Sequence, residues 1–456
     1  MTHVVKTLLA HAEALLSEVL ALESPESPEP TESLSASELP DDAIVARYFK
    51  RRRTLGRSDR AFIADAVYSV LRRKRSLSAR CAQGGAGGVS PRRLLLAALL
   101  CACDDECARP AEYSRAEIEE SLDETERGAV GRACAANLDA LPIAVRLDLP
   151  DWIYDRLVTR LGEENAARLA ECFKQTAPLD LRVDPRKAKR AEIVARLCAE
   201  GFTASACPFS PLGVRLKGKP SLARHPLFLD GSFEVQDEGS QLIGFLLRPK
   251  RGETIVDFCA GAGGKTLLFG AMMRSTGRIY AFDVSGKRLD RILPRLARSG
   301  LSNVHPIRVA SASDARIRRF DGKIDRVFVD APCSGTGTFR RNPGLKWRCT
   351  PGSVAALAAA QAEILESAAS LVRPGGRLVY ATCSVLDEEN DAIARGFLEK
   401  HADFTLLPAS DILNGYIGGK PFERGDECGS GDDAFLRLSP LSHGVDGFFA
   451  AVMERK

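Results

Sequence analysis

The segment from Thr254 to Thr266 reads TIVDFCAGAGGKT. Its first five residues are mostly β-branched or aromatic, which is typical of a buried strand, and its glycines mark a tight turn after that strand. Two later segments, RVFVDAPCSGTG at 326–337 and LVYATCS at 378–384, have a similar form, because an apolar strand runs into a turn that contains a cysteine. Together they predict one sheet with a glycine-rich turn and two cysteines at the same edge.

From Glu253 onward, strand patterns alternate with helical patterns, and this alternation predicts a parallel sheet. We place its strands at residues 254–258, 278–283, 304–309, 326–330 and 376–381. Two late strands, 434–438 and 447–453, are expected to form an antiparallel hairpin on the sheet edge. The segment 246–456 is therefore predicted to be an α/β domain with a Rossmann-like plan.

The beginning of the chain is predicted to be helical. Residues 1–40 combine one amphipathic helix, at 4–22, with a segment rich in Pro, Ser and Glu that cannot bury a core and is interpreted as a linker. Residues 41–147 carry helical patterns, including an apolar helix at 91–103, and predict a small all-helical domain.

A third predicted domain, residues 148–245, precedes the Rossmann-like part. It contains two helical segments, an alternating strand at 177–183 and a basic turn, followed by another helix. Short strands are expected around Val214 and Phe228, and a helix at 242–247 leads into the next domain. We interpret this segment as an α+β unit.

Length and composition narrow the class of protein. At 456 residues the chain is too long for one ordinary core, so two or three domains are expected. The longest wholly apolar run, 94–103, is too short to span a bilayer, so no membrane partner is expected. Acidic residues interrupt the apolar face at the N-terminus and no clear cleavage site follows, which favours a cytoplasmic protein.

The chain has thirteen cysteines. An odd number in a chain of this size favours reduced thiols over a disulfide framework. Cys101, Cys103 and Cys107 are close enough in sequence to suggest zinc, but no histidine is near them and the segment is apolar and helical. We interpret these three as buried helix thiols and expect no metal site.

The net charge of +4 hides a strong local pattern. Residues 23–42 hold seven acids and no base, whereas residues 47–75 hold eleven bases and two acids. A solvated helix face is one interpretation of the basic segment. The clustering of the bases favours the other, which is a contact with nucleic acid.

Three cofactors compete for the glycine-rich turn. A phosphate-binding P-loop requires glycine at the position of Cys259, and a dinucleotide fingerprint requires glycine at that of Thr266. S-adenosylmethionine needs a turn that passes close to its methionine part and a carboxylate that binds both ribose hydroxyls; the glycines permit the first and Asp283 provides the second. A helix cap before Gly286 is the alternative role for Asp283.

The two cysteines at the sheet edge suggest covalent catalysis. Cytosine C5 is too electron-poor to attack a methyl sulfonium, but a thiolate that adds to C6 makes C5 nucleophilic. Asp330 is placed to stabilise the charge that builds up near N3, and a second thiol beside the first would help the final elimination. The alternative is that Cys333 and Cys383 are buried core thiols, but both lie in turns rather than inside strands.

The motifs together resemble those of the RsmB/Sun family of RNA cytosine-C5 methyltransferases, closest to bacterial RsmB, which acts on 16S ribosomal RNA. The resemblance rests on DFCAGAGGKT (257–266), DAPCSGTG (330–337), RRNP (340–343), TCS (382–384) and DGFFA (446–450). Upstream, PLDLRV (178–183) with VQD (235–237) resembles the domain that precedes the catalytic one in this family, and GRSDR (56–60) resembles its NusB-like RNA-binding domain.

The resemblance implies roles for individual residues. Cys383 would be the nucleophile, Cys333 would assist product release, and Asp330 would lie near the reacting centre. The turn would bind S-adenosylmethionine through Cys259, Ala260, Gly261, Ala262, Gly263, Gly264 and Lys265. Asp283 would bind the ribose and Asp314 would lie near the adenine. Ala262 replaces the proline that is more common in this motif, and cofactor binding is expected to survive the change.

Three other functions remain open at this point. A DNA cytosine methyltransferase would use Cys333 as its nucleophile and leave Cys383 without a purpose. A tRNA methyltransferase would share the chemistry, but the NusB-like segment favours ribosomal RNA. A catalytically silent RNA-binding assembly factor would not need both thiols and the cofactor turn. We therefore expect a monomeric 16S rRNA methyltransferase that forms 5-methylcytosine.

Overall fold

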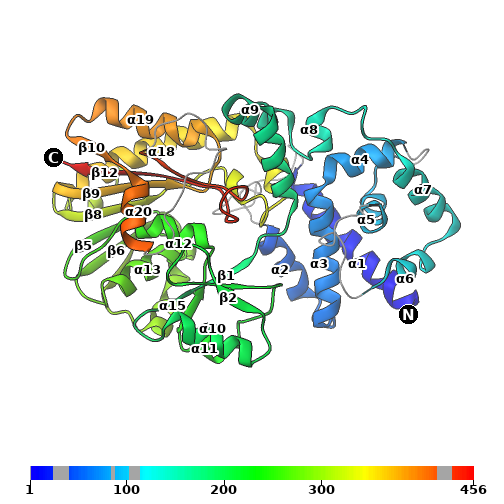
Figure 1. The fold of residues 1–456 in the computed structure, drawn as a ribbon, viewed down its shortest axis with the longest axis horizontal. Coiled ribbons are helices and arrows are strands. Elements are labelled where there is room, and N and C mark those ends of the chain that lie inside the picture. Colours follow the sequence, from blue (N-terminus) through cyan, green and yellow to red (C-terminus); the bar gives the residue numbers. More distant parts are fainter. Residues whose placement is uncertain (1, 24–40, 84–87, 102–112, 418–433) are drawn as a thin grey trace. The chain divides into compact units, whose positions relative to one another are not determined.

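The computed structural model describes residues 2–23, 41–83, 88–101, 113–417 and 434–456, and it divides into two compact units (Figure 1). The helical unit contains Met1–Thr176 and Thr338–Thr350, and the sheet unit contains Ala177–Gly337 and Pro351–Lys456. This division differs from the four predicted segments, because residues 148–176 and 338–350 both group with the helices. The predicted Pro-, Ser- and Glu-rich linker and the cysteines at 103 and 107 lie outside the described residues.

The helical unit is built from short helices around an apolar core. Its elements are α1 (Thr2–Leu20), η1 (Ala21–Glu23), α2 (Asp41–Arg51), α3 (Arg57–Arg72), α4 (Lys74–Gln83), α5 (Pro91–Leu100), α6 (Arg115–Glu120), α7 (Glu124–Ala135), α8 (Ile143–Arg146), α9 (Asp151–Lys174) and α17 (Leu345–Arg348). The predicted helix at 4–22 is confirmed as α1 with η1. Two helices were predicted where α9 lies, and Gly162, with a φ of 77°, interrupts the helix at that point.

The segment 338–350 is bound into the helical unit by buried polar contacts. Asp41, fully buried, accepts hydrogen bonds from Gly344 N at 2.7 Å and from Arg348 Nη2 at 2.9 Å. Lys346 is also fully buried, and its Nζ donates to the backbone oxygens of Arg72 and Asp148 at 2.9 and 3.0 Å. Burial lowers the pKa of Lys346 to about 7. The segment is therefore an internal part of this unit.

One pair of cysteines corrects the expectation of reduced thiols. Cys101, just after α5, and Cys134, in the last turn of α7, form a disulfide with a Cα–Cα distance of 4.7 Å. Helices α5 and α7 pack against each other, which brings together two residues that are 33 positions apart in sequence. Sequence spacing alone does not show such a pairing.

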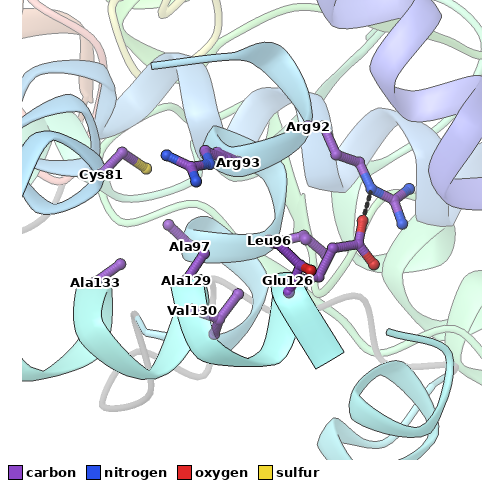
Figure 2. A pocket seen from close by; sticks show the side chains of 10 residues that line it. Cys81, Arg92, Arg93, Leu96, Ala97, Glu126, Ala129, Val130 and Ala133 are labelled. Carbon is purple, nitrogen blue, oxygen red and sulfur yellow. Dashed lines mark hydrogen bonds and ion pairs between the residues drawn. The ribbon is translucent and has the colours of Figure 1, made fainter. Parts of the chain in front are cut away.

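A small cavity of about 80 Å³ lies between α4, α5 and α7 (Figure 2). Small side chains such as Ala97, Ala129 and Ala133 line it, and the ion pair between Arg92 Nε and Glu126 Oε1, at 2.8 Å, lies beside it. The lining is mainly apolar and comes entirely from the helical unit. We attribute the cavity to imperfect helix packing and not to a site for chemistry.

The first half of the sheet unit is a four-stranded antiparallel sheet in the order β2-β3-β1-β4. Its elements are β1 (Leu179–Val183), α10 (Arg190–Ala199), β2 (Ala204–Ala206), β3 (Gly213–Leu216), α11 (Pro226–Leu229), β4 (Phe233–Val235) and α12 (Glu238–Phe245). The strand predicted around Val214 is confirmed as β3. The one predicted around Phe228 is wrong, because Pro226 starts a helical turn that is capped by the His225 side chain.

The second half of the sheet unit is the predicted Rossmann-like domain. Its elements are β5 (Thr254–Phe258), α13 (Gly264–Met272), β6 (Arg278–Asp283), α14 (Gly286–Asp290), α15 (Ile292–Ser299), β7 (Val304–Arg308), α16 (Ala315–Arg318), β8 (Ile324–Asp330), η4 (Thr336–Thr338), α18 (Pro351–Leu371), β9 (Val372–Thr382), η5 (Asp387–Glu389), α19 (Asp391–Lys400), β10 (Phe404–Leu407), α20 (Ala409–Ile417), β11 (Leu436–Leu438) and β12 (Phe448–Arg455). All five predicted parallel strands are present, and β11 pairs with β12 as the predicted hairpin.

The strand order in this sheet is β10-β12-β9-β8-β5-β6-β7. Strand β12 runs antiparallel to β9 on one side. On its other side it pairs with β11 at residues 448–450 and with β10 at residues 452–455, so β10 shares the sheet edge with the predicted hairpin. The sequence prediction missed β10. Its four residues are too short a run to show a clear strand pattern.

Helices cover both faces of this sheet, as Figure 1 shows. One core contains apolar residues of α12, α13, α15 and α20, and the other contains those of α16, α18 and α19. Successive strand residues alternate between the two cores, so that Ile255 belongs to the first and Val256 to the second. Helix α18 is long and apolar enough to cross a membrane by length and composition, but its buried residues pack on β8 and β9. We interpret it as a core helix.

The buried pair Asp41–Arg348 generates a prediction about the stability of the helical unit. Arg348→Met leaves the Asp41 carboxylate buried without its cation, which should lower the free energy of unfolding by about 3–5 kcal/mol. Both tryptophans of the chain, Trp152 and Trp347, lie in the helical unit, so urea unfolding followed by tryptophan fluorescence reports on this unit. Asp41→Asn combined with Arg348→Met should recover part of the loss. A loss below about 1 kcal/mol for the single variant would contradict this account.

Candidate active site

The predicted cofactor turn lies between β5 and α13. Cys259, directly after the strand, has a φ of 68°, and Gly261 and Gly263 have φ values of 58° and 82°. A Cβ atom on Gly263 would lie 2.9 Å from the Ile292 side chain, whereas one on Gly261 would have no atom within 4 Å. The turn therefore needs glycine at 263 for packing, and the space beside Gly261 is open to a ligand.

Asp283 closes this turn from the end of β6. Its two carboxylate oxygens accept hydrogen bonds from Gly261 N at 2.8 Å and from Ser285 N at 2.7 Å. Helix α14 is capped by the side chain of Ser285, which accepts from Arg288 N. The structure therefore gives the capping role to Ser285, and Asp283 instead links the turn to the second strand.

An ion pair connects the glycine-rich turn to the DAPCSGTG motif, which begins at Asp330. Lys265, near the start of α13, donates from Nζ to Oδ2 of Asp330 at 2.7 Å. Asp257 is buried below the turn and accepts a hydrogen bond from Thr266, and its burial raises its pKa to about 7. The Oδ1 atom of Asp257 has no hydrogen-bond partner among the described residues. A buried polar atom without a partner is typical of a site that binds a polar ligand or a water molecule.

The two predicted thiols meet at the end of neighbouring strands. Parallel pairing of β8 with β9 sets Asp330 opposite Ala381, and the turns that follow carry Cys333 and Cys383. Their sulfur atoms are 3.4 Å apart, within hydrogen-bond distance for sulfur. The hydrogen bond to Cys383, together with burial, raises the pKa of Cys333 well above the usual thiol value. This shift favours the S–H form of Cys333.

Arg182 of the antiparallel sheet and Arg295 of α15 also hold the turn that is predicted to bind the cofactor, and the sequence prediction gave them no such role. Arg182 Nη1 donates to the backbone oxygen of Gly264 at 2.7 Å, and Arg295 Nη1 donates to that of Ala262 at 2.6 Å. Glu234, opposite Arg182 in the β1–β4 pair, accepts from Arg295 at 3.0 Å. Arg182 lies in the PLDLRV motif, which the sequence analysis had singled out. Its partner, the backbone oxygen of Gly264, could not be identified from the sequence.

The structure gives Asp314 a local role. It precedes α16, and its carboxylate accepts hydrogen bonds from Ala310 N at 2.7 Å and from Arg316 N at 2.9 Å. Arg316 also forms an ion pair with it at 2.6 Å. Its assignment to the adenine stays a prediction, and its contacts with Ala310 and Arg316 give it a structural role without a ligand.

Eight of the eleven bases of residues 47–75 form two groups in the helical unit, and the other three, Arg52, Arg60 and Lys74, are partly buried. Arg72 and Arg73 are buried, and Arg75 binds Asp151 at 2.7 Å, so these residues are structural. Five bases of α2, the α2–α3 turn and the start of α3 are exposed: Arg47, Lys50, Arg51, Arg53 and Arg57. We call these five the α2–α3 basic cluster, and it is the part of the basic segment that is available to a polyanion.

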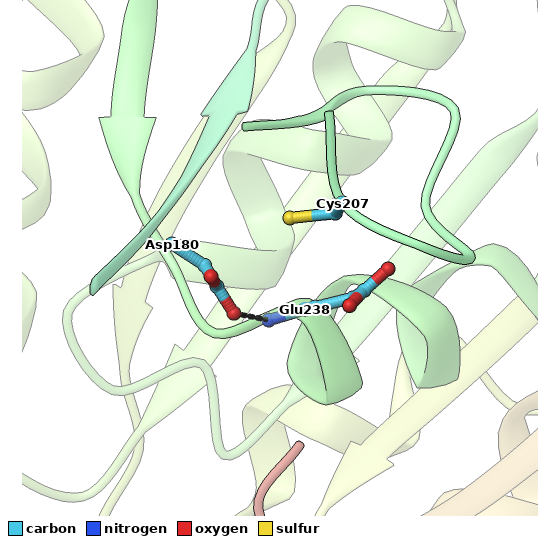
Figure 3. A group of neighbouring side chains, drawn as sticks. All are labelled: Asp180, Cys207 and Glu238. Atoms are coloured by element: carbon cyan, nitrogen blue, oxygen red, sulfur yellow. Dashed lines mark hydrogen bonds between the residues drawn. The ribbon is translucent and has the colours of Figure 1, made fainter. Parts of the chain in front are cut away.

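Asp180, Cys207 and Glu238 form the one group among the described residues whose ligand atoms are close enough to hold a metal ion (Figure 3). Arg215 is already bound to both carboxylates, at 2.8 Å from Asp180 and 3.3 Å from Glu238. Glu238 also accepts from the backbone nitrogen of Phe209 at 2.6 Å. The guanidinium supplies the positive charge that a cation would supply, so we interpret the group as structural.

Comparison with known proteins identifies the family to which the chain is related. A family model described as 16S rRNA methyltransferase RsmB/F matches residues 244–454, and one described as the ferredoxin-like domain of RsmF/B-like methyltransferases matches residues 149–223. The second match corresponds to α9 and most of the antiparallel sheet. The two matches together contain every predicted site residue from Cys259 to Cys383.

Two solved structures from Pyrococcus horikoshii resemble this chain. One is a methyltransferase homologue that is 30% identical, covers 70% of this chain and 100% of its own, and has a TM-score of 0.58. The other is NSun6, solved with SFG, an analogue of S-adenosylmethionine. It is 21% identical, covers 67% of this chain and 98% of its own, and has the same TM-score, so it supports the fold.

A curated relative from Synechocystis sp. is described as a probable ribosomal RNA small subunit methyltransferase B. It is 31% identical over 435 residues, which are 91% of this chain and 95% of the relative. This similarity extends over the helical unit as well as the sheet unit. The chain therefore belongs to the RsmB/F family of S-adenosylmethionine-dependent 16S rRNA methyltransferases.

Proposed function

We propose that this protein forms 5-methylcytosine in 16S ribosomal RNA and that Cys383 makes a transient covalent bond to C6 of the target base. The observation that carries the proposal is the 3.4 Å separation of the Cys333 and Cys383 sulfur atoms at one edge of the sheet. A methyltransferase that modifies an already nucleophilic atom has no need of a thiol pair. Addition to C6 is the chemistry that makes cytosine C5 reactive.

The pair of thiols gives each step a structural basis. The Cys383 thiolate adds to C6, and the electron pair of the C5–C6 double bond moves so that C5 becomes nucleophilic. After methylation the C5 proton leaves to a base, the double bond re-forms, and the Cys383–C6 bond breaks with return of its electron pair to sulfur. The Cys333 S–H group can donate a hydrogen bond to the Cys383 sulfur both before attack and during departure.

The residues around the glycine turn fit S-adenosylmethionine, which supplies the methyl group when bound. The open space beside Gly261, the Asp283 carboxylate and the unpartnered Oδ1 of Asp257 all lie around this turn. Arg182 and Arg295 fix the carbonyl groups of the turn. We assign these residues to cofactor binding and Asp330 to the reacting base, where its ion pair with Lys265 keeps it close to the turn.

Ribosomal RNA as the substrate is supported by the helical unit and by the relative from Synechocystis. The α2–α3 basic cluster can neutralise phosphates, which accounts for affinity but not for the choice of target. A cytosine must leave its stack before its C6 atom can meet a thiol, so the substrate is expected to present the base in a loop or an opened helix.

The covalent step can be tested with purified protein, S-adenosylmethionine and small-subunit rRNA from cells that lack this activity. Cys383→Ala should abolish both methyl transfer and the RNA–protein adduct on denaturing gels, because the nucleophile is gone. Cys333→Ala should accumulate the adduct, because the departing thiolate loses its hydrogen-bond donor. Cys198→Ala, which removes an exposed thiol of α10, should behave as the unaltered protein.

The reverse pattern, in which Cys383→Ala traps RNA and Cys333→Ala does not, would contradict the assignment of the nucleophile. Absence of methyl transfer to rRNA by the unaltered protein, with transfer to tRNA under the same conditions, would contradict the substrate. Absence of transfer to either RNA would support a silent RNA-binding factor and overturn the proposed activity.

Binding of RNA by the α2–α3 basic cluster makes a prediction about salt dependence. Changing Arg51, Arg53 and Arg57 to Gln should weaken RNA binding at low salt and reduce the slope of log Kd against log salt by about 2–3. A matched control changes three exposed bases of the same unit outside the cluster, Lys6, Arg127 and Arg132, to Gln. Equal slopes for the two triple variants would show that the cluster has no special role.

A further inference from the structure

A buried polar network lies beneath the two thiol-bearing turns of the sheet unit. Its members share burial and a side-chain hydrogen bond within the network, and they come from the turns and from the elements that follow: Ser334, Thr336, Gln361, Tyr380, Ser384 and Glu389. The exposed surface of each is at most 8%. Neither the reaction described above nor the sequence prediction uses these residues.

Glu389 is the charged member of this network. Its Oε1 atom accepts hydrogen bonds from Ser334 N at 2.7 Å and from Gln361 Nε2 at 3.1 Å, and its Oε2 atom accepts one from Ser334 Oγ. Its side chain is 0% exposed, and among the described residues its carboxylate has no cation as an ion-pair partner. A buried carboxylate is costly to keep, and three hydrogen bonds to it offset that cost.

These contacts determine where the Cys333 turn lies. Ser334 follows Cys333 directly, so the hydrogen bond from Ser334 N to Glu389 fixes the backbone at the thiol. Gln361 forms a second hydrogen bond to this turn, because its Nε2 also donates to the backbone oxygen of Pro332 at 2.8 Å. The backbone is therefore fixed on both sides of Cys333. The Glu389 carboxylate binds Ser334 N after it, and the Gln361 amide, itself bound to Glu389, binds the Pro332 oxygen before it.

The same network joins this turn to the one that carries Cys383. Thr336 Oγ1 lies 3.0 Å from Ser384 Oγ and accepts from Val385 N at 3.0 Å. Gly337 N donates to the backbone oxygen of Cys383 at 2.9 Å. The distance between the two sulfur atoms is consequently set by contacts that converge below them, and not by the thiols themselves.

We propose that Glu389 is a positioning residue for the thiol pair: it holds the Cys333 turn against Cys383 and keeps Cys333 as the S–H partner. This rests on the proposed function, because it assigns Cys383 as nucleophile and Cys333 as its hydrogen-bond donor. Glu389 touches neither the base nor the cofactor in this account. It acts through Ser334 and through its negative charge.

The negative charge of Glu389 matters because it disfavours a second negative charge on the nearby Cys333 sulfur. The titratable groups that face Cys333 are Cys383, Tyr380 and Glu389. The hydrogen bond to Cys383 is the largest cause of the raised pKa of Cys333, burial is the next, and the Glu389 charge raises it further. Removing that charge while keeping the shape of the side chain should therefore make the Cys333 thiolate easier to form.

The test measures alkylation of Cys333 by iodoacetamide against pH, read by peptide mass spectrometry in a Cys383→Ala background. Glu389→Gln should move the midpoint of the profile down by about one pH unit, which corresponds to about tenfold faster alkylation at pH values below both midpoints. Glu388→Gln, which makes the same charge change one residue away at a partly exposed position, should leave the profile in place.

A second readout follows the RNA adduct in the presence of Cys383. Glu389→Gln should prolong the adduct, because an amide nitrogen replaces one carboxylate oxygen and cannot accept the hydrogen bonds of Ser334 or Gln361, so the Cys333 turn is held less closely against Cys383. Glu389→Asp keeps the charge but cannot reach Ser334 as closely, so it should leave the alkylation midpoint near its usual value and still prolong the adduct. This variant also serves if Glu389→Gln does not fold.

The two readouts separate the possible failures. A profile for Glu389→Gln that matches that of Glu388→Gln, together with an unchanged adduct lifetime, would overturn the proposal for Glu389. A shifted profile with no RNA adduct in any variant would support the role of Glu389 in holding Cys333 and would overturn the proposed covalent reaction instead. The alkylation measurement needs neither RNA nor cofactor, so it stands without the proposed function.

Discussion

The parallel pairing of β8 with β9 is the constraint on which the site depends. It sets Asp330 level with Ala381, so that the two turns beyond them begin at the same edge and bring two sulfur atoms to within 3.4 Å. The pairing is reinforced by β12, because Gly447 N donates to Gly337 O at 2.8 Å and a Cβ on Gly337 would lie 2.1 Å from the Gly447 oxygen. Glycine at both positions is therefore a packing requirement, and it brings the PCSGTG and DGFFA segments into contact.

The antiparallel sheet completes the cofactor side of the site. Arg182 and Arg295 bind the carbonyl groups of the glycine turn, and Glu234 neutralises part of their charge. Arg182, in β1, fixes this turn from outside the Rossmann-like domain, and Arg295 fixes it from α15 within that domain. The domain that precedes the catalytic one thus helps to fix the turn that we assign to cofactor binding.

Residues whose role is local could be predicted from the sequence, and those whose role depends on distant partners could not. The strands β5 and β6 were predicted to the residue, because apolar runs end in glycine or acidic turns. Glu389 was missed because its function comes from Ser334 and Gln361, which are brought to it only by the fold. The predicted RNA contact was too broad for the same reason, since Arg72 and Arg73 are buried in the helical unit. The disulfide between Cys101 and Cys134 likewise follows from the packing of α5 on α7 and not from spacing.

The most direct test of this account is to identify the cysteine that bonds to the base. RNA in which the target cytidine carries fluorine at C5 forms the C6 adduct and accepts the methyl group, but it has no C5 proton to lose, so the enzyme remains attached. Digestion of the complex and mass spectrometry of the RNA-linked peptide then give the attacking residue. The account predicts the peptide that contains Cys383. Attachment through Cys333 would contradict it, and the thiol pair would have to be assigned in the opposite order.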